Sequence, residues 1–220
     1  MSTLPSIKIL TNSSLLFDVS HYSEQHILAT QKKLWALSQY CKNTNEFIDL
    51  VPGMNSLTLY LKSASNLHQW QNTLTKLWDE VDDYAFESQH HKIDTYYQGE
   101  DLNYVANYHK LTIDEVINLH SKEIYHVLFL GFVPGFPYLH GLNAQLFTPR
   151  RDNPRVSVPK GAIAIGADQT GIYPENSPGG WHIIGHTQLT LFDPDAMPPT
   201  YLQPGDTVCF IPQRDKGGQT

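Results

Sequence analysis

The sequence predicts an α+β protein of two domains, a small α/β domain followed by a domain rich in short strands. Glycine and proline are unevenly distributed: residues 1–130 hold four of them and residues 131–220 hold the other 24. Arginine follows the same division, and its only positions are Arg150, Arg151, Arg155 and Arg214. The first part instead carries apolar residues at regular helix and strand spacings. The two parts are therefore expected to be built on different principles.

The pattern of apolar and turn residues over the first 61 positions predicts a hairpin, a helix and two further strands. Residues 6–19 form two short strands around the polar turn Asn12-Ser13. Ser23 is expected to cap a helix over 23–40 that places Leu34 and Leu37 toward one side. Strands follow at 47–51, which stops at Pro52-Gly53, and at 57–61.

A second helix has the clearest pattern in the chain. Its apolar residues recur every three or four positions, with Asn66 as the expected cap, and are Leu67, Trp70, Leu74, Leu77, Trp78 and Val81. A last strand within 84–96 completes the order strand, helix, strand, strand, helix, strand of ferredoxin-like domains. The acidic run Asp79, Glu80, Asp82 and Asp83 is interpreted as a solvated helix end rather than a metal site.

The second part begins with two short connecting helices, the second opened by a capping box of Thr112 and Glu115. YHVLFLGF, from Tyr125, is a strand without alternation, as in strands buried on both faces. Further short strands are expected in VSVP, AIAIG, GIYP, HIIGH, LTLF and DTVCFIP. Many short strands with dense turn residues indicate a barrel or a sandwich.

Composition excludes several classes of function. A net charge of -7 argues against unaided nucleic-acid binding, which needs a basic face. Cys41 and Cys209 lie far apart and suit neither a disulfide framework nor a thiolate metal site. Without a signal-like N-terminus or a long apolar run, we expect a cytoplasmic protein that does not enter a membrane. The P-loop and Gly-x-Ser-x-Gly motifs are missing, so an ATP site of P-loop type and a serine hydrolase are not expected.

Three stretches suggest a binding site. GFVPGFPYLHGL (131–142) places aromatic residues among rigid prolines and permissive glycines. PRRDNPR (149–155) gathers three arginines, whose planar forks suit carboxylate or phosphate. GADQTGIYPENSPGGW (166–181) ends in a Pro-Gly-Gly-Trp turn.

These stretches, with LQPGDTVCFIP, resemble the family that includes PxpB (the B subunit of 5-oxoprolinase), the sporulation-kinase inhibitor KipI and subunit 1 of allophanate hydrolases. The same module is found in the carboxyltransferase domain of urea carboxylase. The likeness covers about Asp101 to Pro212, while the first 95 residues match weakly, with TNSSLLFDVS where the family shows a Gly-Asp-Ser-Ala turn.

The resemblance implies a ferredoxin-like domain over 1–96 and a cyclophilin-like β-barrel domain over 97–220. It also implies two partners, a PxpC-like protein and a PxpA-like protein. ATP, with Mg²⁺, is the implied co-substrate that activates 5-oxoproline for opening to L-glutamate. On its own the chain is expected to be inactive.

This chemistry needs groups that hold an anion and stabilise developing negative charge. Arg150, Arg155 and Gln169 are the candidate catalytic residues. The candidate substrate- or nucleotide-binding residues are Gly135, Phe136, Tyr138, Tyr173, Pro178, Gly179, Gly180 and Trp181. Each has a structural alternative: an arginine paired with Asp152 or loop carbonyls, aromatics that only fill a core, and glycines that only make a turn.

No metal site is expected. His182 and His186 would share one face of a strand, and His90-His91 is interpreted as a surface pair. His186, Lys160 and Ala162 depart from the residues usual in the family. Two other functions stay open: a KipI-like inhibitor of a histidine kinase, with an interface around Phe132, Phe136 and Trp181, and a carboxyltransferase-type module acting on urea or a related amide.

Overall fold

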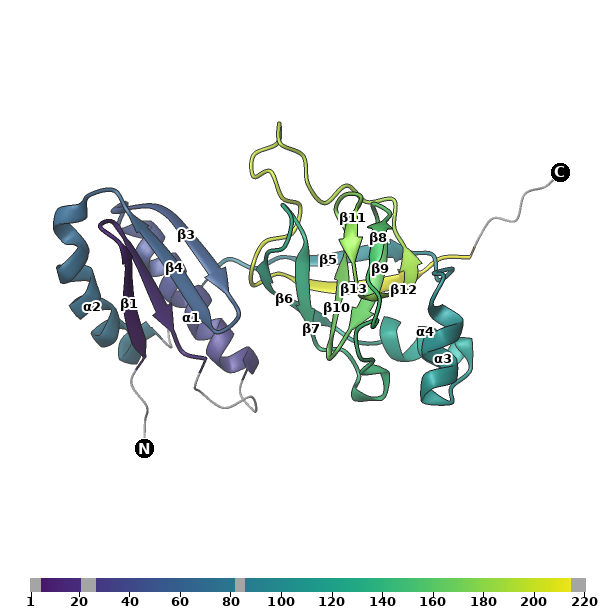
Figure 1. The fold of residues 1–220 in the computed structure, drawn as a ribbon. Coiled ribbons are helices and arrows are strands. Elements are labelled where there is room, and N and C mark those ends of the chain that lie inside the picture. The colour runs from purple at the N-terminus through teal and green to yellow at the C-terminus, as the bar shows by residue number, and fades with distance from the viewer. Residues whose placement is uncertain (1–4, 21–26, 82–85, 215–220) are drawn as a thin grey trace. The chain divides into compact units, whose positions relative to one another are not determined.

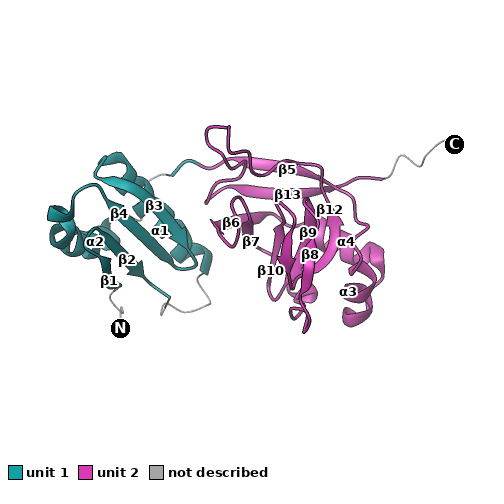
Figure 2. Cartoon of the chain, turned by 45° about the horizontal axis from the view of Figure 1, so that its top comes forward, with its two compact units in different colours: residues 1–87 teal, residues 88–220 magenta. Residues whose placement is uncertain are grey.

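The computed structural model describes residues 5–20, 27–81 and 86–214. The chain divides into two compact units, Met1–Glu87 (unit 1) and Ser88–Thr220 (unit 2), each with its own core (Figure 2).

Unit 1 is a four-stranded antiparallel sheet with two helices (Figure 1). Its elements are β1 (Ser6–Thr11), β2 (Ser14–Asp18), α1 (Ile27–Asn43), β3 (Phe47–Gly53), β4 (Ser56–Leu61), the short 3₁₀ helix η2 (Ala64–Asn66) and α2 (Leu67–Glu80). The sheet order is β1-β2-β4-β3. One apolar cluster joins alternate residues of β2 and β4 to residues of both helices, which therefore cover the same face of the sheet.

One detail of unit 1, the cap of its second helix, differs from the sequence prediction. Asn66 precedes α2, but its side chain makes no cap hydrogen bond and instead donates to Glu46 Oε2 at 3.1 Å. The indole Nε1–H of Trp70 donates to the same oxygen at 2.7 Å. Ser23, Asp82 and Asp83 lie outside the described residues. Asp79 and Glu80 are exposed at the end of α2.

The strand predicted to complete a ferredoxin-like sheet lies elsewhere. β5 (His90–Thr95) belongs to unit 2, where it pairs in parallel with β13 (Thr207–Pro212). The edge position beside β2 is taken by β1. The predicted βαββαβ order is thus wrong at its last strand, and the chain divides before that strand rather than at 96/97.

Unit 2 is a nearly closed barrel-like sheet of seven strands with two helices. After β5 come α3 (Leu102–His109), α4 (Ile113–Ser121), β6 (Tyr125–Leu130), β7 (Pro137–His140), the 3₁₀ helix η4 (Ala144–Leu146), β8 (Arg155–Val158), β9 (Ala162–Gly166), β10 (Gln169–Ile172), β11 (Ser177–Gly179), β12 (His182–His186) and β13.

The order of the large sheet is β12-β9-β10-β7-β6-β13-β5. Its two outermost strands are brought together by an antiparallel bridge, in which the Tyr96 and His186 backbones exchange hydrogen bonds of 2.9 Å. β8 and β11 form a separate two-stranded sheet. The segment 189–192, predicted as a strand, makes only a bridge from Phe192 to Thr200. The capping box of Thr112 and Glu115 is confirmed at the start of α4.

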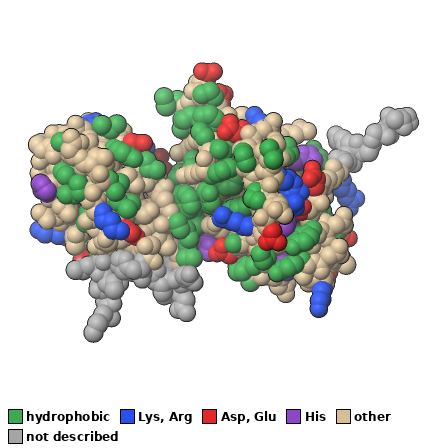
Figure 3. Space-filling view, viewed as in Figure 1, with side chains coloured by type: hydrophobic (Ala, Val, Ile, Leu, Met, Phe, Trp, Pro, Cys, Tyr) green, Lys and Arg blue, Asp and Glu red, His purple; other side chains and the backbone are tan. Residues whose placement is uncertain are grey.

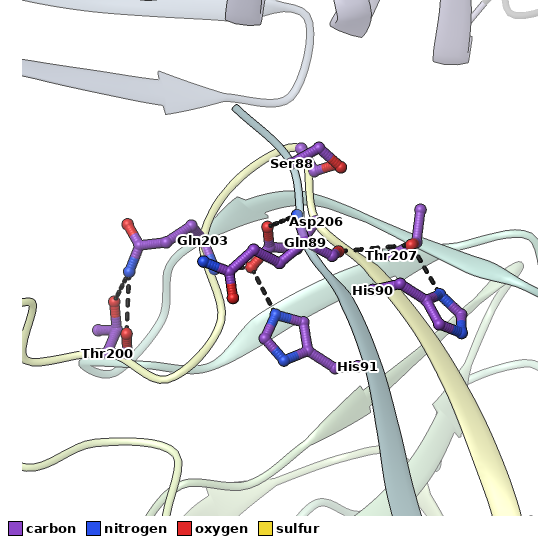
Figure 4. A network of polar contacts seen from close by, with 9 residues as sticks. Ser88, Gln89, His90, His91, Thr200, Gln203, Asp206 and Thr207 are labelled. Atoms are coloured by element: carbon purple, nitrogen blue, oxygen red, sulfur yellow. Dashed lines mark hydrogen bonds and ion pairs between the residues drawn. The ribbon is translucent and has the colours of Figure 1, made fainter. Parts of the chain in front are cut away.

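The beginning of β5 is fixed to the turn before β13 by a polar network around Asp206 (Figure 4). Its carboxylate accepts from the backbone N–H groups of Gln89 at 2.8 Å and Gln203 at 2.9 Å, and lies 3.0 Å from His91 Nε2. His91 is only 8% exposed, so the interpretation of His90-His91 as a surface pair is correct for His90 and wrong for His91.

Candidate functional site

The arginine segment 149–155 is held by one buried carboxylate. Asp101, which immediately precedes α3, binds Arg155 in a two-pronged contact, with Nη1 to Oδ2 at 2.8 Å and Nη2 to Oδ1 at 2.9 Å. Arg151 Nη1 donates to the same Oδ1 at 2.9 Å. The exposed Glu100 adds a contact of 3.2 Å to Arg155 Nη2. Arg155 is therefore ion-paired, but with Asp101 and Glu100 rather than with Asp152.

The electrostatics keep Asp101 ionised. Burial raises the pKa of Asp101, but the hydrogen bond from Arg155, the N–H of Ile183 at 2.8 Å and the arginine charges outweigh it, so the pKa lies below its usual range. The hydrogen bond to Asp101 in turn raises the pKa of Arg155. Asp101 and Arg155 thus stay charged throughout the physiological range.

The backbone of the same segment is fixed to β12 and to the turn before it. His182 Nε2–H donates to the Pro149 carbonyl at 2.9 Å, and the Arg151 N–H donates to the Gly180 carbonyl at 2.8 Å. The His182 ring stacks on Tyr104 of α3, with centroids 4.6 Å apart and planes 9° from parallel. Burial lowers the pKa of His182, which favours its neutral form.

Beside this segment lies a cluster of aromatic side chains, which unites four of the eight candidate binding residues. Phe136 meets Tyr173 at 5.1 Å, Tyr138 at 5.1 Å and Trp181 at 5.6 Å between ring centroids. Phe136, Tyr173 and Trp181 are buried, and Tyr138 is half-buried. The Arg150 guanidinium lies over the Trp181 ring, 5.8 Å from its centroid. Figure 3 shows Lys and Arg side chains close to acidic and His side chains on the part of unit 2 where β8 and β12 lie.

The glycines of the Pro-Gly-Gly turn have different surroundings. A Cβ on Gly179 would meet the Tyr173 hydroxyl at 2.3 Å, whereas a Cβ on Gly180 would approach nothing closer than Pro154 at 3.6 Å. Gly179 pairs with Arg155 across the β8–β11 ladder. The absence of a side chain at Gly179 thus serves its packing on Tyr173, whereas a Cβ at Gly180 would make only ordinary van der Waals contacts.

The remaining candidates lie around this cluster. Gly135 adopts φ +79° in the loop before β7, a conformation that favours glycine. Gln169 begins β10 and pairs with Gly166 of β9. A Cβ added to Gly166 would lie 2.5 Å from the Trp181 ring. Pro178 is exposed on β11. The catalytic or binding roles of these residues stay predictions.

Sequence reasoning missed Asp101, Tyr104 and the part played by His182. An Asp before a helix is normally interpreted as its cap, but the Asp101 side chain makes no cap hydrogen bond. A β-bulge in β12 between Ile183 and Gly185 interrupts the alternation, so His182 is buried and His186 is exposed against Tyr96. Ala162 is buried, and the Lys160 N–H donates to Asn176 Oδ1 at 2.8 Å.

Within the described ranges, no three or more His, Cys, Asp or Glu side chains are grouped so as to hold a metal ion. A search of the same ranges finds no helix with both the length and the apolarity to cross a membrane.

The fold and site define a barrel-containing α/β module of the carboxyltransferase type. The family model described as carboxyltransferase domain, subdomain C and D, matches residues 5–202, and the chain belongs to this family. The B subunit of 5-oxoprolinase from Haemophilus influenzae is 44% identical over 184 residues, which is 82% of this chain and 86% of that protein. The protein of the same name from Escherichia coli O157:H7 is 44% identical over 192 residues, 86% of this chain and 88% of that protein.

Solved structures share the fold. The crystal structure of TTHA0988 has a TM-score of 0.77 at 31% identity, covers 94% of this chain, and is longer, since this chain spans 40% of it. The urea carboxylase of Kluyveromyces lactis has a TM-score of 0.66 at 18% identity over 96% of this chain and 22% of its own, a likeness of fold alone.

Proposed function

We propose that this chain is the PxpB-type component, or B subunit, of an ATP-dependent 5-oxoprolinase complex in the cytoplasm, inactive alone and active with a PxpC-like protein and a PxpA-like protein. The observation that carries the proposal is the 44% identity to proteins named as the B subunit of 5-oxoprolinase over more than four fifths of both chains. The name of these relatives supports a role in a complex of several subunits. We also propose that the barrel of unit 2 is of the cyclophilin-like class.

The reaction explains why such a site needs an anion-binding group beside an apolar wall. The lactam of 5-oxoproline is resonance-stabilised, and ATP, with Mg²⁺, would supply the phosphoryl group that makes its carbonyl carbon electrophilic. The substrate carboxylate and the ATP phosphates are both oxyanions, so they call for guanidinium and N–H donors.

The residues present fit an oxyanion. Arg150 is exposed above Trp181, and the position beside the Gly180 backbone is less crowded than at Gly179, with nothing nearer than 3.6 Å to an added Cβ. Arg150 and the Gly180 N–H would hold the oxyanion, while the buried rings of Phe136, Tyr173 and Trp181 exclude water from the inner side. Exclusion of water strengthens each polar contact to the ligand.

The test is co-expression of this chain with the PxpA-like and PxpC-like proteins of the same genome. We expect release of glutamate from 5-oxoproline that requires ATP and all components. Consistent lack of ATP-coupled glutamate release from a well-assembled complex would refute the proposal.

Two of the three residues expected to form the interface of a KipI-like inhibitor are buried. Its interface was expected around Phe132, Phe136 and Trp181, but Phe136 is 2% and Trp181 5% exposed, and only Phe132, at 59%, is available to a partner. Binding of this chain to a histidine kinase, with no glutamate release in the co-expression test, would favour that alternative. The description of the family supports the carboxyltransferase part of the third alternative, whereas its urea part rests on a likeness of fold alone.

A further inference from the structure

The three arginines of 149–155 are not equivalent. Arg151 and Arg155 are both bound to Asp101, and Arg155 is also bound to Glu100. These two guanidinium groups and two carboxylates cancel in charge. Arg150 is exposed and makes no ion pair with any residue in the described ranges, and its guanidinium lies over the Trp181 ring. Arg150 is therefore the arginine of the segment whose guanidinium is not held by a carboxylate of the described residues.

The backbone around Arg150 is fixed from both sides. On one side, the Pro149 carbonyl accepts from His182 Nε2–H at 2.9 Å. On the other, the Arg151 N–H donates to Gly180 at 2.8 Å while the Arg151 side chain donates to Asp101 at 2.9 Å. With both neighbours tied down, the Cα of Arg150 has little freedom, and its side chain is presented above Trp181.

The contacts that fix the Arg150 backbone leave two groups in arrangements that disfavour folding. Asp101 precedes α3 but leaves the helix without its side-chain cap, which an Asp in that position ordinarily provides. His182 is 3% exposed, and its Nδ1 is a buried acceptor with no hydrogen-bond partner within the described parts of the chain. Local arrangements that disfavour folding are characteristic of sites where a side chain must be positioned.

We propose that Arg150, supported by the Trp181 ring, binds the oxyanion of the ligand, and that Asp101 and His182 are positioning residues that fix the Arg150 backbone. The ligand class, a carboxylate or phosphate, rests on the proposed function. Arg155, also predicted as an anion-binding residue, then serves to hold the segment on Asp101.

The direct test uses the chain alone, because Trp181 is the only tryptophan of unit 2 and reports on Arg150. Inorganic phosphate and 5-oxoproline are titrated separately while tryptophan fluorescence is recorded. We expect a saturable change with at least one of them, and the two titrations tell phosphate from carboxylate recognition. The change should vanish in Arg150→Gln and Trp181→Phe and remain in Arg214→Gln, an arginine outside the segment. An equal response in Arg150→Gln, or no saturable response in the parent chain, would overturn the assignment of Arg150.

The positioning role is tested in the assembled complex. A charged hydrogen bond lost on Arg150→Gln should raise the KM of one anionic substrate, 5-oxoproline or ATP, about 10- to 100-fold. Asp101→Asn and His182→Leu should raise the same KM, whereas His182→Gln, which keeps an N–H donor, should restore it in large part. A purely structural role would lower kcat with the yield of folded complex and leave that KM unchanged, and this result would remove Asp101 and His182 from the proposal. If the parent complex lacks ATP-coupled turnover, the proposed function fails, and the fluorescence titrations still decide the role of Arg150.

Discussion

The two units stabilise their cores in different ways. The core of unit 1 is formed by long amphipathic helices against a sheet, and the buried polar residues of its described part are Ser14, Thr30, Gln31 and Asn55. Unit 2 buries many more, namely His91, Thr95, Asp101, His120, Thr148, Thr170, Ser177, His182, Thr187 and Asp206. Regular elements can meet through apolar contact alone, whereas short strands joined by Gly- and Pro-rich corners are tied together by buried hydrogen bonds.

His120 shows how unit 2 uses such bonds. Its Nδ1 lies 2.8 Å from the Tyr97 hydroxyl, and its Nε2 lies 3.0 Å from Thr170 Oγ1. The Thr170 hydroxyl donates to the Ala164 carbonyl at 2.9 Å, so it accepts from Nε2–H, and Nδ1 accepts from Tyr97. A single imidazole thus links α4, the residues after β5 and β10.

The largest effect is expected in unit 1. Phe17 is fully buried, with its ring 5.2 Å from that of Trp78. Phe17→Ala should lower the free energy of unfolding by about 3–5 kcal/mol, because it removes contacts and leaves a cavity. Urea unfolding, monitored by hydrogen exchange of peptides from β2 and β4, measures this change in the free energy of unfolding. Phe17→Leu, which keeps most of the volume, should cost much less, and an equal loss in both variants would contradict packing as the cause.

The second effect is expected in unit 2 and depends on a polar group. His120→Leu should lower the free energy of unfolding by about 2–3 kcal/mol at neutral pH, because the Tyr97 hydroxyl is left as a buried donor without an acceptor. Adding Tyr97→Phe removes that donor, so the double variant should be more stable than His120→Leu. If the double variant is the less stable one, the hydrogen bond is not the cause.

The same histidine gives unit 2 a pH dependence. Burial lowers the pKa of His120 to about 3, below its ordinary value near 6.5. This contribution to stability is complete above pH ~6.5 and is lost as the pH falls toward 3, because the unfolded chain binds a proton that the folded chain does not. The loss should be about 1.4 kcal/mol per pH unit in that window. The stability difference between the parent and His120→Leu, measured by urea unfolding at pH 7.5 and 5.0, should shrink accordingly; a constant difference would exclude His120 as its source.

The sequence predicted regular elements better than it predicted their partners. The spacing of Leu67, Trp70 and Leu74 locates α2, and the Thr112–Glu115 pair locates the start of α4, because these signals are local. The placement of β5 failed, since its alternating pattern is equally suited to either sheet. Its partner β13 lies more than a hundred residues away in the chain, and no local signal specifies that pairing.

The site shows the same limit. The motifs pointed to the segments that carry Arg150, Arg155, Phe136, Tyr173 and Trp181, and the fold brings these side chains together. They did not point to Asp101, because its contacts with Arg151 and Arg155 cross 50 or more residues. Nor did they separate Gly179 from Gly180, whose difference lies in the position of Tyr173.

That difference gives the smallest and most specific prediction. Gly179→Ala places a Cβ 2.3 Å from the Tyr173 hydroxyl, whereas the nearest atom to a Cβ on Gly180 is 3.6 Å away. Gly179→Ala should therefore cost about 1–2 kcal/mol through overpacking, and Gly180→Ala less than about 0.5 kcal/mol. Thermal unfolding of the two single variants measures this directly. Tyr173→Phe, which removes the clashing oxygen, should recover part of the loss in Gly179→Ala but give no recovery in Gly180→Ala. If the two alanine variants are equally destabilised, the contact with Tyr173 is not the reason why position 179 requires glycine.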